Sequence, residues 1–322
     1  MSLTASIVIA TYRRPQDLAA CLDSILGQSA PPLEVIVVDN DARRSAQATL
    51  CPYEAQYRAQ RILLRYQASP KNSPSCARNL GVQLAQGDIV LFLDDDVVLE
   101  KDYLSEILKV YAACPTALGV QGYITNSYEG PRFWRKVFFQ PDCTPDVCRV
   151  LPSIRSIYPL TPKTILPCEH LSGSNASYRH SILMEFPQDE NLLKYSFGED
   201  LDQSYRIFQR HPDTLWLTPF ARCIHKNSPA GRATSQERVY MIEIYGLYLF
   251  YKLFPKTLKN VAIYWWSFLG RILGKIKHPS RATCVEVGHL LGAWILCMAH
   301  LHEIKAGNLE FSTAPFPGET CH

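Results

Sequence analysis

Three consecutive aspartates, Asp94, Asp95 and Asp96, come directly after the apolar run DIVLFL at 88–93. A buried strand cannot hold three carboxylates, so we expect them at its exposed carboxyl end. Because side chains alternate along an extended chain, Asp94 and Asp96 should share one face and Asp95 should lie on the other. Two converging carboxylates suit a hard divalent cation, which can bridge the phosphate oxygens of a nucleotide. A solvated acidic turn is the alternative, although a turn does not need three acids.

Other polar residues follow predicted strands in the same way. Thr11 and Tyr12 follow SIVIA at 6–10, and Asp39 follows LEVIVV at 33–38, where it could accept from a base imide or a ribose hydroxyl. Arg78 stands in the first turns of a predicted helix, whose free N–H groups could contact a phosphate together with the guanidinium. Taken singly, these residues are equally consistent with ordinary turns and a surface helix.

The elements that must position these residues follow from the apolar pattern. Continuous apolar runs at 6–10, 33–38, 61–66 and 88–93 are typical of strands buried on both faces. Helical spacing occurs between them, at 18–26 and 76–84, after proline signals at Pro15 and Pro74. This alternation predicts a doubly wound α/β sheet with a parallel core, whose ligands lie beyond the carboxyl ends of the strands.

Further elements are predicted beyond residue 100. The pattern indicates helices at 104–111 and 199–210 and strands at 118–124, 214–218 and 221–225. No element is predicted in the segment 125–167. We therefore expect an α/β domain over 1–228, a helical region over 229–305 and a tail over 306–322.

An ordered set of motifs over the first two thirds of the chain resembles the inverting family 2 glycosyltransferases of the GT-A fold. The motifs are TASIVIATYRRPQDLAACLDSIL, VIVVDN, SCARNLGVQLAQGDIVLFLDDDV, SGSNASYR and GEDLDQSYRIFQR. Their order is specific, whereas any one of them would be weak. The resemblance implies a mixed, Rossmann-like sheet and the transfer of a sugar from a nucleotide-diphosphate donor of the UDP, dTDP or GDP type.

The resemblance also implies roles for individual residues. It implies Mn²⁺ or Mg²⁺ as cofactor, held by Asp96 with Asp94 and by His225, although an isolated histidine is as often a surface residue. On the donor side it implies nucleotide contacts from the strand ends and the helix that follows, namely Thr11, Tyr12, Arg13, Asp39, Arg78, Asp94 and Asp95.

The catalytic residues implied by the resemblance lie later in the chain. Glu199 and Asp200 match the Glu-Asp motif, whose aspartate acts as the general base that takes the proton of the acceptor hydroxyl. The segment that lines the donor sugar and the acceptor matches Gly173, Ser174 and Asn175. A competing interpretation is that the acids at 199–202 only compensate the dipole of the helix that they begin.

Two departures from the family pattern narrow the function. The loop before Arg78 reads ASPKNSPSC and lacks the usual glycine, so we expect its contacts with phosphate or base to differ from those of the family. The Gln-x-x-Arg-Trp motif of processive synthases is absent, so we expect transfer of a single sugar to a glycan or lipid-linked acceptor.

A sugar-1-phosphate nucleotidyltransferase is the alternative function, but ATYRRPQD carries no glycine-rich phosphate loop. A non-catalytic, membrane-bound binding module is the third possibility.

Charge is distributed unevenly along the chain, whose formal net charge is +3. No acid occurs between Glu243 and Glu286, whereas seven bases do: Lys252, Lys256, Lys259, Arg271, Lys275, Lys277 and Arg281. An apolar, aromatic stripe at helical spacing accompanies them: Val261, Tyr264, Trp265, Phe268, Leu269, Ile272 and Ile276. A basic aromatic helix of this kind predicts contact with an anionic membrane surface, and a helical cap on the catalytic domain is the alternative.

Location follows from the same features. The uncharged apolar stretches are shorter than the roughly 18 to 20 residues that span a bilayer, so we expect peripheral attachment. The eleven cysteines are scattered, and the first residues lack a charged segment leading into an apolar one, which predicts reduced thiols and a cytoplasmic protein. No nucleic-acid-binding module surrounds the basic residues, so no nucleic-acid partner is expected.

Overall fold

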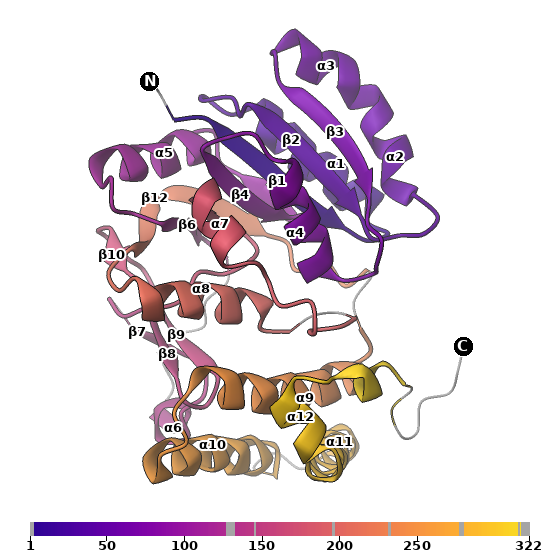
Figure 1. Cartoon of the computed structure of the whole chain (residues 1–322), viewed down its shortest axis with the longest axis vertical. Coiled ribbons are helices and arrows are strands. Elements are labelled where there is room, and N and C mark those ends of the chain that lie inside the picture. Colours follow the sequence, from indigo (N-terminus) through magenta and orange to yellow (C-terminus); the bar gives the residue numbers. More distant parts are fainter. Residues whose placement is uncertain are drawn as a thin grey trace.

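The structure is a computed structural model that describes residues 3–126, 133–144, 146–194, 197–230, 233–276, 280–314 and 316. Its centre is a nine-stranded mixed sheet in the order β10-β12-β6-β11-β4-β1-β2-β3, with β5 paired to β12 (Figure 1). The first half contains the parallel strands β1 (Ala5–Thr11), β2 (Glu34–Asp39), β3 (Leu63–Ala68) and β4 (Ile89–Asp94). The predicted fold class is confirmed.

Helices cover both faces of this sheet, which explains why its central strands are continuously apolar. One face packs on α1 (Pro15–Leu26), α2 (Ser45–Leu50), α3 (Glu54–Ala59) and α5 (Tyr103–Ala113). The other packs on α4 (Pro74–Leu84), α7 (His180–Glu185) and α8 (Glu199–Arg210). The predicted start of α4 is correct: Ser73 accepts from the N–H of Cys76, and Pro74 occupies the first turn.

The second half of the sheet contains β5 (Val97–Leu99), β6 (Gly119–Ile124), β10 (Leu166–Pro167), β11 (Ala176–Arg179) and β12 (Leu215–His225). The two short strands predicted at 214–218 and 221–225 are one strand, β12. Its register on β6 shifts between Thr218 and Arg222. Pro219 lies at this irregularity and interrupts the apolar pattern, which is why the sequence suggested two strands.

The segment 125–167, for which no element was expected, contains a helix and several short strands. It contains α6 (Phe133–Val137) and a three-stranded sheet of β7 (Asp142–Thr144), β8 (Arg149–Leu151) and β9 (Arg155–Pro159). These strands have only three to five residues, too few to produce a periodic pattern. Val150 and Ile154 instead pack into a core formed mainly by the C-terminal helices.

The C-terminal region is helical, as predicted. It comprises α9 (Ser235–Leu253), α10 (Leu258–Ile276), α11 (Arg281–Ala299), α12 (Leu301–Ala306) and a 3₁₀ turn at Glu310–Thr313. A second 3₁₀ turn, at Cys51–Tyr53, lies between α2 and α3. α9 lies between α8, which packs on the large sheet, and the outer helices α10 and α11 (Figure 1). The helix α11 could cross a membrane by length and composition alone, with a mean hydropathy of 1.5. The prediction considered only uncharged stretches, whereas this helix reaches its length by including Arg281 and Glu286.

Candidate functional site

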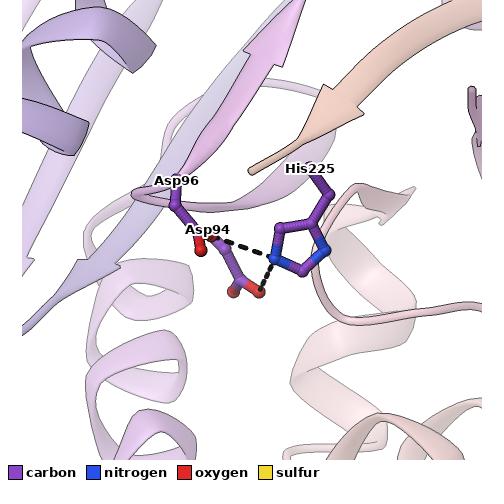
Figure 2. A group of neighbouring side chains, drawn as sticks. All are labelled: Asp94, Asp96 and His225. Atoms are coloured by element: carbon purple, nitrogen blue, oxygen red, sulfur yellow. Dashed lines mark ion pairs between the residues drawn. The ribbon is translucent and has the colours of Figure 1, made fainter. Parts of the chain in front are cut away.

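Two carboxylates and an imidazole converge beyond the carboxyl end of β4. Asp94 ends β4, Asp96 precedes β5, and His225 ends β12, opposite Val97 of β5. The Nε2 atom of His225 lies 3.0 Å from Asp96 Oδ1 and 3.9 Å from Asp94 Oδ2 (Figure 2). One ligand atom from each residue lies within 4.8 Å of the other two. The shared face predicted for Asp94 and Asp96 is thus formed, and His225 joins it.

These three residues fit a divalent metal ion. Asp96 is buried, and its Oδ1 accepts no hydrogen bond from the described residues, while its Oδ2 accepts from the N–H of Ser228 at 2.9 Å. Burial raises the pKa of Asp96, but His225, Ser228 and Arg14 outweigh it, so the pKa lies below its usual value. Two carboxylates and an imidazole with ligand atoms this close together are a suitable donor set for a divalent metal ion.

Asp95 has different partners from Asp96, although Arg14 Nη1 lies near both carboxylates, at 3.0 Å from Asp95 and 3.6 Å from Asp96. Its carboxylate accepts from Thr11 Oγ1 at 2.7 Å and from Arg14 Nη1 at 3.0 Å. Burial raises its pKa to about 6, against the opposing effect of Arg14 and Thr11. The guanidinium of Arg14 also donates to the carbonyls of Ser228 and Ala230. Arg14 therefore ties the end of β1 to the loop after β12, a role that the sequence analysis missed although Arg14 lies within the ATYRR motif.

Arg78 contacts both Asp94 of the candidate metal site and Glu199 of the Glu-Asp motif. Its Nη2 donates to Asp94 Oδ1 at 2.7 Å and its Nη1 to Glu199 Oε1 at 2.9 Å, and the residue is 4% exposed. Burial first, and then the neighbouring Asp200, raise the pKa of Glu199 to about 7, although Arg78 lowers it. Gly198 precedes this pair with a φ of 86°, a left-handed conformation that allows the chain to turn directly into α8.

Asp200 is held by three neighbours. Its Oδ2 accepts from the N–H of Gly173 at 2.9 Å and lies 3.5 Å from His170 Nε2, and its Oδ1 accepts from the N–H of Leu201 at 2.7 Å. Burial raises the pKa of Asp200, but His170, Gly173 and Arg78 together lower it to about 2. Asp200 is therefore a carboxylate at neutral pH. His170 could not be identified from the sequence, because it lies just before SGSN and belongs to no motif itself.

The segment of Gly173, Ser174 and Asn175 passes between these groups. A Cβ on Gly173 would lie 3.0 Å from Arg78 Nη1 and 3.1 Å from Asp200 Cβ, so this position favours glycine. The carbonyl of Ser174 accepts from the N–H of Asp94 at 3.1 Å. Asn175 is fully buried, and its amide donates to the carbonyl of Gly122. The described contacts of this segment thus position Asp94 and Asp200.

The remaining donor-side residues lie at the ends of β1 and β2. Asp39 is buried, and its two oxygens accept from the N–H groups of Asp41 and Ala46, both at 2.9 Å. Arg13 pairs with Asp41 at 3.2 Å and lies over the ring of Tyr12. Asp39 therefore holds the loop after β2 in place beside the predicted donor site.

A cavity of about 490 Å³ is lined both by residues near the strand ends and by residues of α9. Its walls include Thr11, Tyr12, Asp94, Asp95, Arg78 and Glu199 from the sheet side. Glu237 and Met241, from the first turns of α9, complete it. The C-terminal region therefore contributes to the site, which the sequence did not suggest.

Comparison with known proteins agrees with this architecture. A family model described as "Glycosyl transferase family 2" matches residues 6–186. The chain is 34% identical over 139 residues to the succinoglycan biosynthesis protein ExoM of Rhizobium meliloti, covering 42% of this chain and 43% of ExoM. It is 25% identical over 142 residues to a glucosyl-dolichyl phosphate glucuronosyltransferase of Haloferax volcanii, covering 42% of this chain and 44% of that protein. The matches thus span less than half of these relatives' length.

Solved structures share the fold over nearly the whole chain. The mannosyltransferase PcManGT of Pyrobaculum calidifontis, in complex with GDP-Man and Mn²⁺, aligns with a TM-score of 0.57 at 16% identity, covering 97% of this chain and 88% of that one. Residues 1–349 of TarS from S. aureus, in complex with UDP-GlcNAc, align with a TM-score of 0.56 at 15% identity, covering 96% and 89%.

Proposed function

The chain belongs to glycosyl transferase family 2, and from this membership we propose that it moves one sugar from a nucleotide-diphosphate donor to a hydroxyl of a glycan or lipid-linked acceptor, with inversion. The observation that carries this proposal is the chain of contacts from the Asp94–Asp96–His225 cluster through Arg78 to Glu199 and Asp200, beside one cavity. In this arrangement a divalent metal that binds the diphosphate would lie a short distance from the carboxylate that acts as the base. No feature of the described site favours nucleotidyl transfer instead.

On the donor side, Asp94, Asp96 and His225 would hold Mn²⁺, which when bound offsets the charge that develops on the leaving diphosphate. The residues at the ends of β1 and β2, including Tyr12 and Asp39, would contact the nucleoside. A UDP or GDP donor is supported by the structural neighbours, which were solved in complex with GDP-Man and UDP-GlcNAc. Arg14 and Arg78 keep the acidic cluster partly neutralised.

On the acceptor side, Asp200 would accept the proton of the attacking hydroxyl. Direct displacement at the anomeric carbon needs one carboxylate for this proton, and inversion follows from a single displacement. Hydrogen bonds from Gly173 and Leu201 fix the carboxylate, and its lowered pKa keeps it unprotonated. We further propose that the protein works in the cytoplasm as a peripheral protein on an anionic membrane, where a lipid-linked acceptor would be found.

The test compares Asp200→Asn with Asp202→Asn, which removes an acid from the same first turn of α8. We would measure release of UDP or GDP from UDP-glucose, UDP-GlcNAc and GDP-mannose with Mn²⁺ and a lipid extract as acceptor, and nucleotide binding by thermal shift. Asp200→Asn should lose on the order of 10² to 10⁴ in turnover while still binding nucleotide. Asp202→Asn should change stability but retain turnover. Near-normal turnover in Asp200→Asn would exclude it as the base.

A further inference from the structure

The helix α10 has two apolar faces, only one of which packs inside the protein. On the inner face, Tyr264 lies 4.7 Å from the Phe250 ring of α9, and Arg271 pairs with Glu243 of α9 at 2.6 Å. Trp265 also contacts this core, and Phe268 lies under the Arg271 guanidinium. The stripe that was predicted to contact a membrane therefore lies mostly on the inner face, and Trp265 and Phe268 are half-buried there.

The opposite face of α10 carries a second apolar stripe in contact with solvent. Its members recur at helical spacing and are all exposed: Leu258, Ala262, Trp266, Leu269, Leu273 and Ile276. The four from Trp266 onward are 40% to 56% exposed. Because this stripe lies on the far side of the helix from Tyr264 and Arg271, it faces away from α9.

The helix α11 repeats this arrangement. Ala293 and Cys297 are buried in the core formed with α9, and Gly292 approaches the Tyr240 hydroxyl so closely that a Cβ would lie 2.3 Å from it. Cys284, Gly288, Leu291 and Ile295 form an exposed stripe on the opposite side, flanked by Val285 and Trp294. The close packing of α11 on α9 indicates that it lies on the catalytic part and does not leave it to cross a bilayer.

The short helix α6 extends the same surface. Phe133 and Trp134 are 72% and 59% exposed. Phe138 stacks between Trp134 and Trp266, and the Trp266 indole donates to the carbonyl of Val137 at 2.9 Å, so α6 is fixed against α10. These three helices lie together at the lower end of the molecule in Figure 1. Of the seventeen large apolar side chains that are exposed in the described part of the chain, eleven lie on α6, α10 and α11.

The charges around this surface identify its partner. Three of the seven bases in the acid-free segment are paired, Lys252 with Asp189 and Asp202, Arg271 with Glu243, and Lys275 with Glu286. Lys256 donates to the carbonyl of Tyr251, Lys259 and Arg281 are exposed beside the stripes, and Lys277 lies outside the described residues. The excess is positive but smaller than the sequence suggested. Apolar surface of this size, with tryptophans and a few bases, matches the interface of an anionic bilayer.

We propose that the docking face, defined as the outward stripes of α10 and α11 together with Phe133 and Trp134 of α6, lies flat on an anionic lipid bilayer. Apolar insertion supplies most of the binding, and Lys259 and Arg281 add selectivity for anionic lipid. The helix α9, whose residues Glu237 and Met241 line the cavity, separates this face from the catalytic sheet. Docking would therefore hold the cavity near the lipid headgroups, which, resting on the proposed function, favours a membrane-borne acceptor.

The test is flotation of the full chain with phosphatidylcholine vesicles, with and without phosphatidylglycerol. The docking variant combines Trp266→Ser, Leu269→Ser and Leu273→Ser. Its matched control combines Leu63→Ser, Met184→Ser and Phe220→Ser, which are apolar residues elsewhere on the surface and are somewhat more exposed than those of the docking variant. We expect the parent and the control to float with anionic vesicles and the docking variant to bind at least roughly tenfold less tightly. Lys259→Gln with Arg281→Gln should reduce binding to anionic vesicles only.

Nucleotide binding with Mn²⁺, measured by thermal shift, keeps this test independent of the proposed reaction, because every variant should retain it. A docking variant that floats like the parent would overturn the proposal. So would a parent that ignores vesicles and forms dimers through this face, as sedimentation would show. Resistance of the bound parent to alkaline carbonate would indicate that α11 spans the membrane and would overturn flat docking.

We also infer that His170 is a positioning residue for Asp200. Its Nε2 faces Asp200 Oδ2 at 3.5 Å, and its Nδ1 contacts Ser156 Oγ at 2.9 Å and the Tyr158 hydroxyl at 2.8 Å. In the tautomer in which one of these hydroxyls donates to Nδ1, the imidazole proton is on Nε2 and faces the carboxylate. Ser156 and Tyr158 belong to β9, so the small sheet supports the base.

A double-mutant comparison tests this role. His170→Phe keeps a ring but removes the N–H group, so kcat should fall with little change in KM, and His170→Gln should recover part of the loss. In an Asp200→Asn background, His170→Phe should have no further effect. An equal loss in both backgrounds would show a merely structural role and overturn the inference. Normal turnover of Asp200→Asn alone would instead overturn the proposed base.

Discussion

Asp96 combines two properties that are rarely found together, near-complete burial and a carboxylate oxygen that accepts no hydrogen bond from the described residues. Burial of a carboxylate without a partner is unfavourable unless a cation compensates for it. His225 supplies part of this compensation at 3.0 Å. A divalent ion would supply the rest, so the local structure is better satisfied with the ion than without it.

For this reason we expect Asp96→Ala to abolish the stabilisation that Mn²⁺ adds to UDP or GDP binding. The parent should gain about 2.7 kcal/mol when the ligand is at 100 times its dissociation constant. Thermal shift with and without Mn²⁺ measures this gain. Asp102→Ala, at an exposed position, is the control. Mn²⁺-dependent stabilisation that survives in Asp96→Ala would exclude this residue as a ligand.

Glu199 should make stability depend on pH. Its pKa is raised to about 7 by burial and by Asp200, so the folded chain binds this proton more tightly than the unfolded chain. The stabilisation is complete below pH 4.5 and is lost as the pH rises to about 7, so the free energy of unfolding should fall across this window. Asp200 acts in the opposite direction, but only below its ordinary pKa of 3.8.

Glu199→Gln removes this titration, so the variant should lose less stability than the parent between these pH values. The difference should be on the order of 1 to 3 kcal/mol. Urea unfolding at a series of pH values measures it. Glu185→Gln, on an exposed glutamate, should follow the parent. Parallel curves for the parent and Glu199→Gln would show that Glu199 is not shifted.

At the scale of elements, prediction from sequence succeeded where an element carries its own signal. The strands β1, β2 and β4 are continuous apolar runs, and α1 and α4 begin with proline, so each could be recognised alone. The strands β7 to β9 depend on partners that are distant in the sequence. The faces of α10 were misassigned because both are apolar, and periodicity cannot show which of two apolar faces packs inward. His170 was missed because its role depends on neighbours that are distant in the sequence.

The first turn of α9 makes an element-scale prediction possible. Thr234 Oγ1 accepts from the N–H of Glu237, and the Glu237 carboxylate accepts from the N–H of Thr234, which is a capping box. Glu237 also lines the cavity. Thr234→Ala should therefore lower the free energy of unfolding by about 1 kcal/mol and weaken nucleotide-sugar binding.

The matched control is Ser280→Ala, which removes the equivalent cap from α11, far from the cavity. Denaturant unfolding should show a similar loss of stability, whereas calorimetric titration with UDP-GlcNAc and Mn²⁺ should show unchanged binding. Equal effects of the two variants on binding would mean that the start of α9 does not shape the site.

At the scale of the whole molecule, the C-terminal helices share their core with the rest of the chain. Leu192 and Leu201, from the α/β part, are buried in the same cluster as Ile244, Leu249 and Ala293. The boundary near residue 228 remains a prediction about sequence organisation. The shared core indicates that the parts on either side of this boundary depend on one another for stability.

We therefore expect Ile244→Ala, at a fully buried position of α9, to destabilise the entire chain by about 2 to 5 kcal/mol. Tryptophan fluorescence reports mainly on the outer helices, which hold Trp265, Trp266 and Trp294, whereas nucleotide binding reports on the sheet. Both transitions should shift together. Loss of the fluorescence transition with nucleotide binding retained would show that the regions unfold separately.

The pairing of β12 with β5 has a consequence for how this protein can change during evolution. β5 has only three residues, and it sets His225 opposite Val97, immediately after Asp96. An insertion of one residue between Arg222 and His225 would leave the strand paired but turn the imidazole to the other side of the sheet. Many substitutions on this strand should be tolerated, but changes of its length should not. The number of residues between the irregularity in β12 and His225 should therefore be more restricted than the identities of those residues.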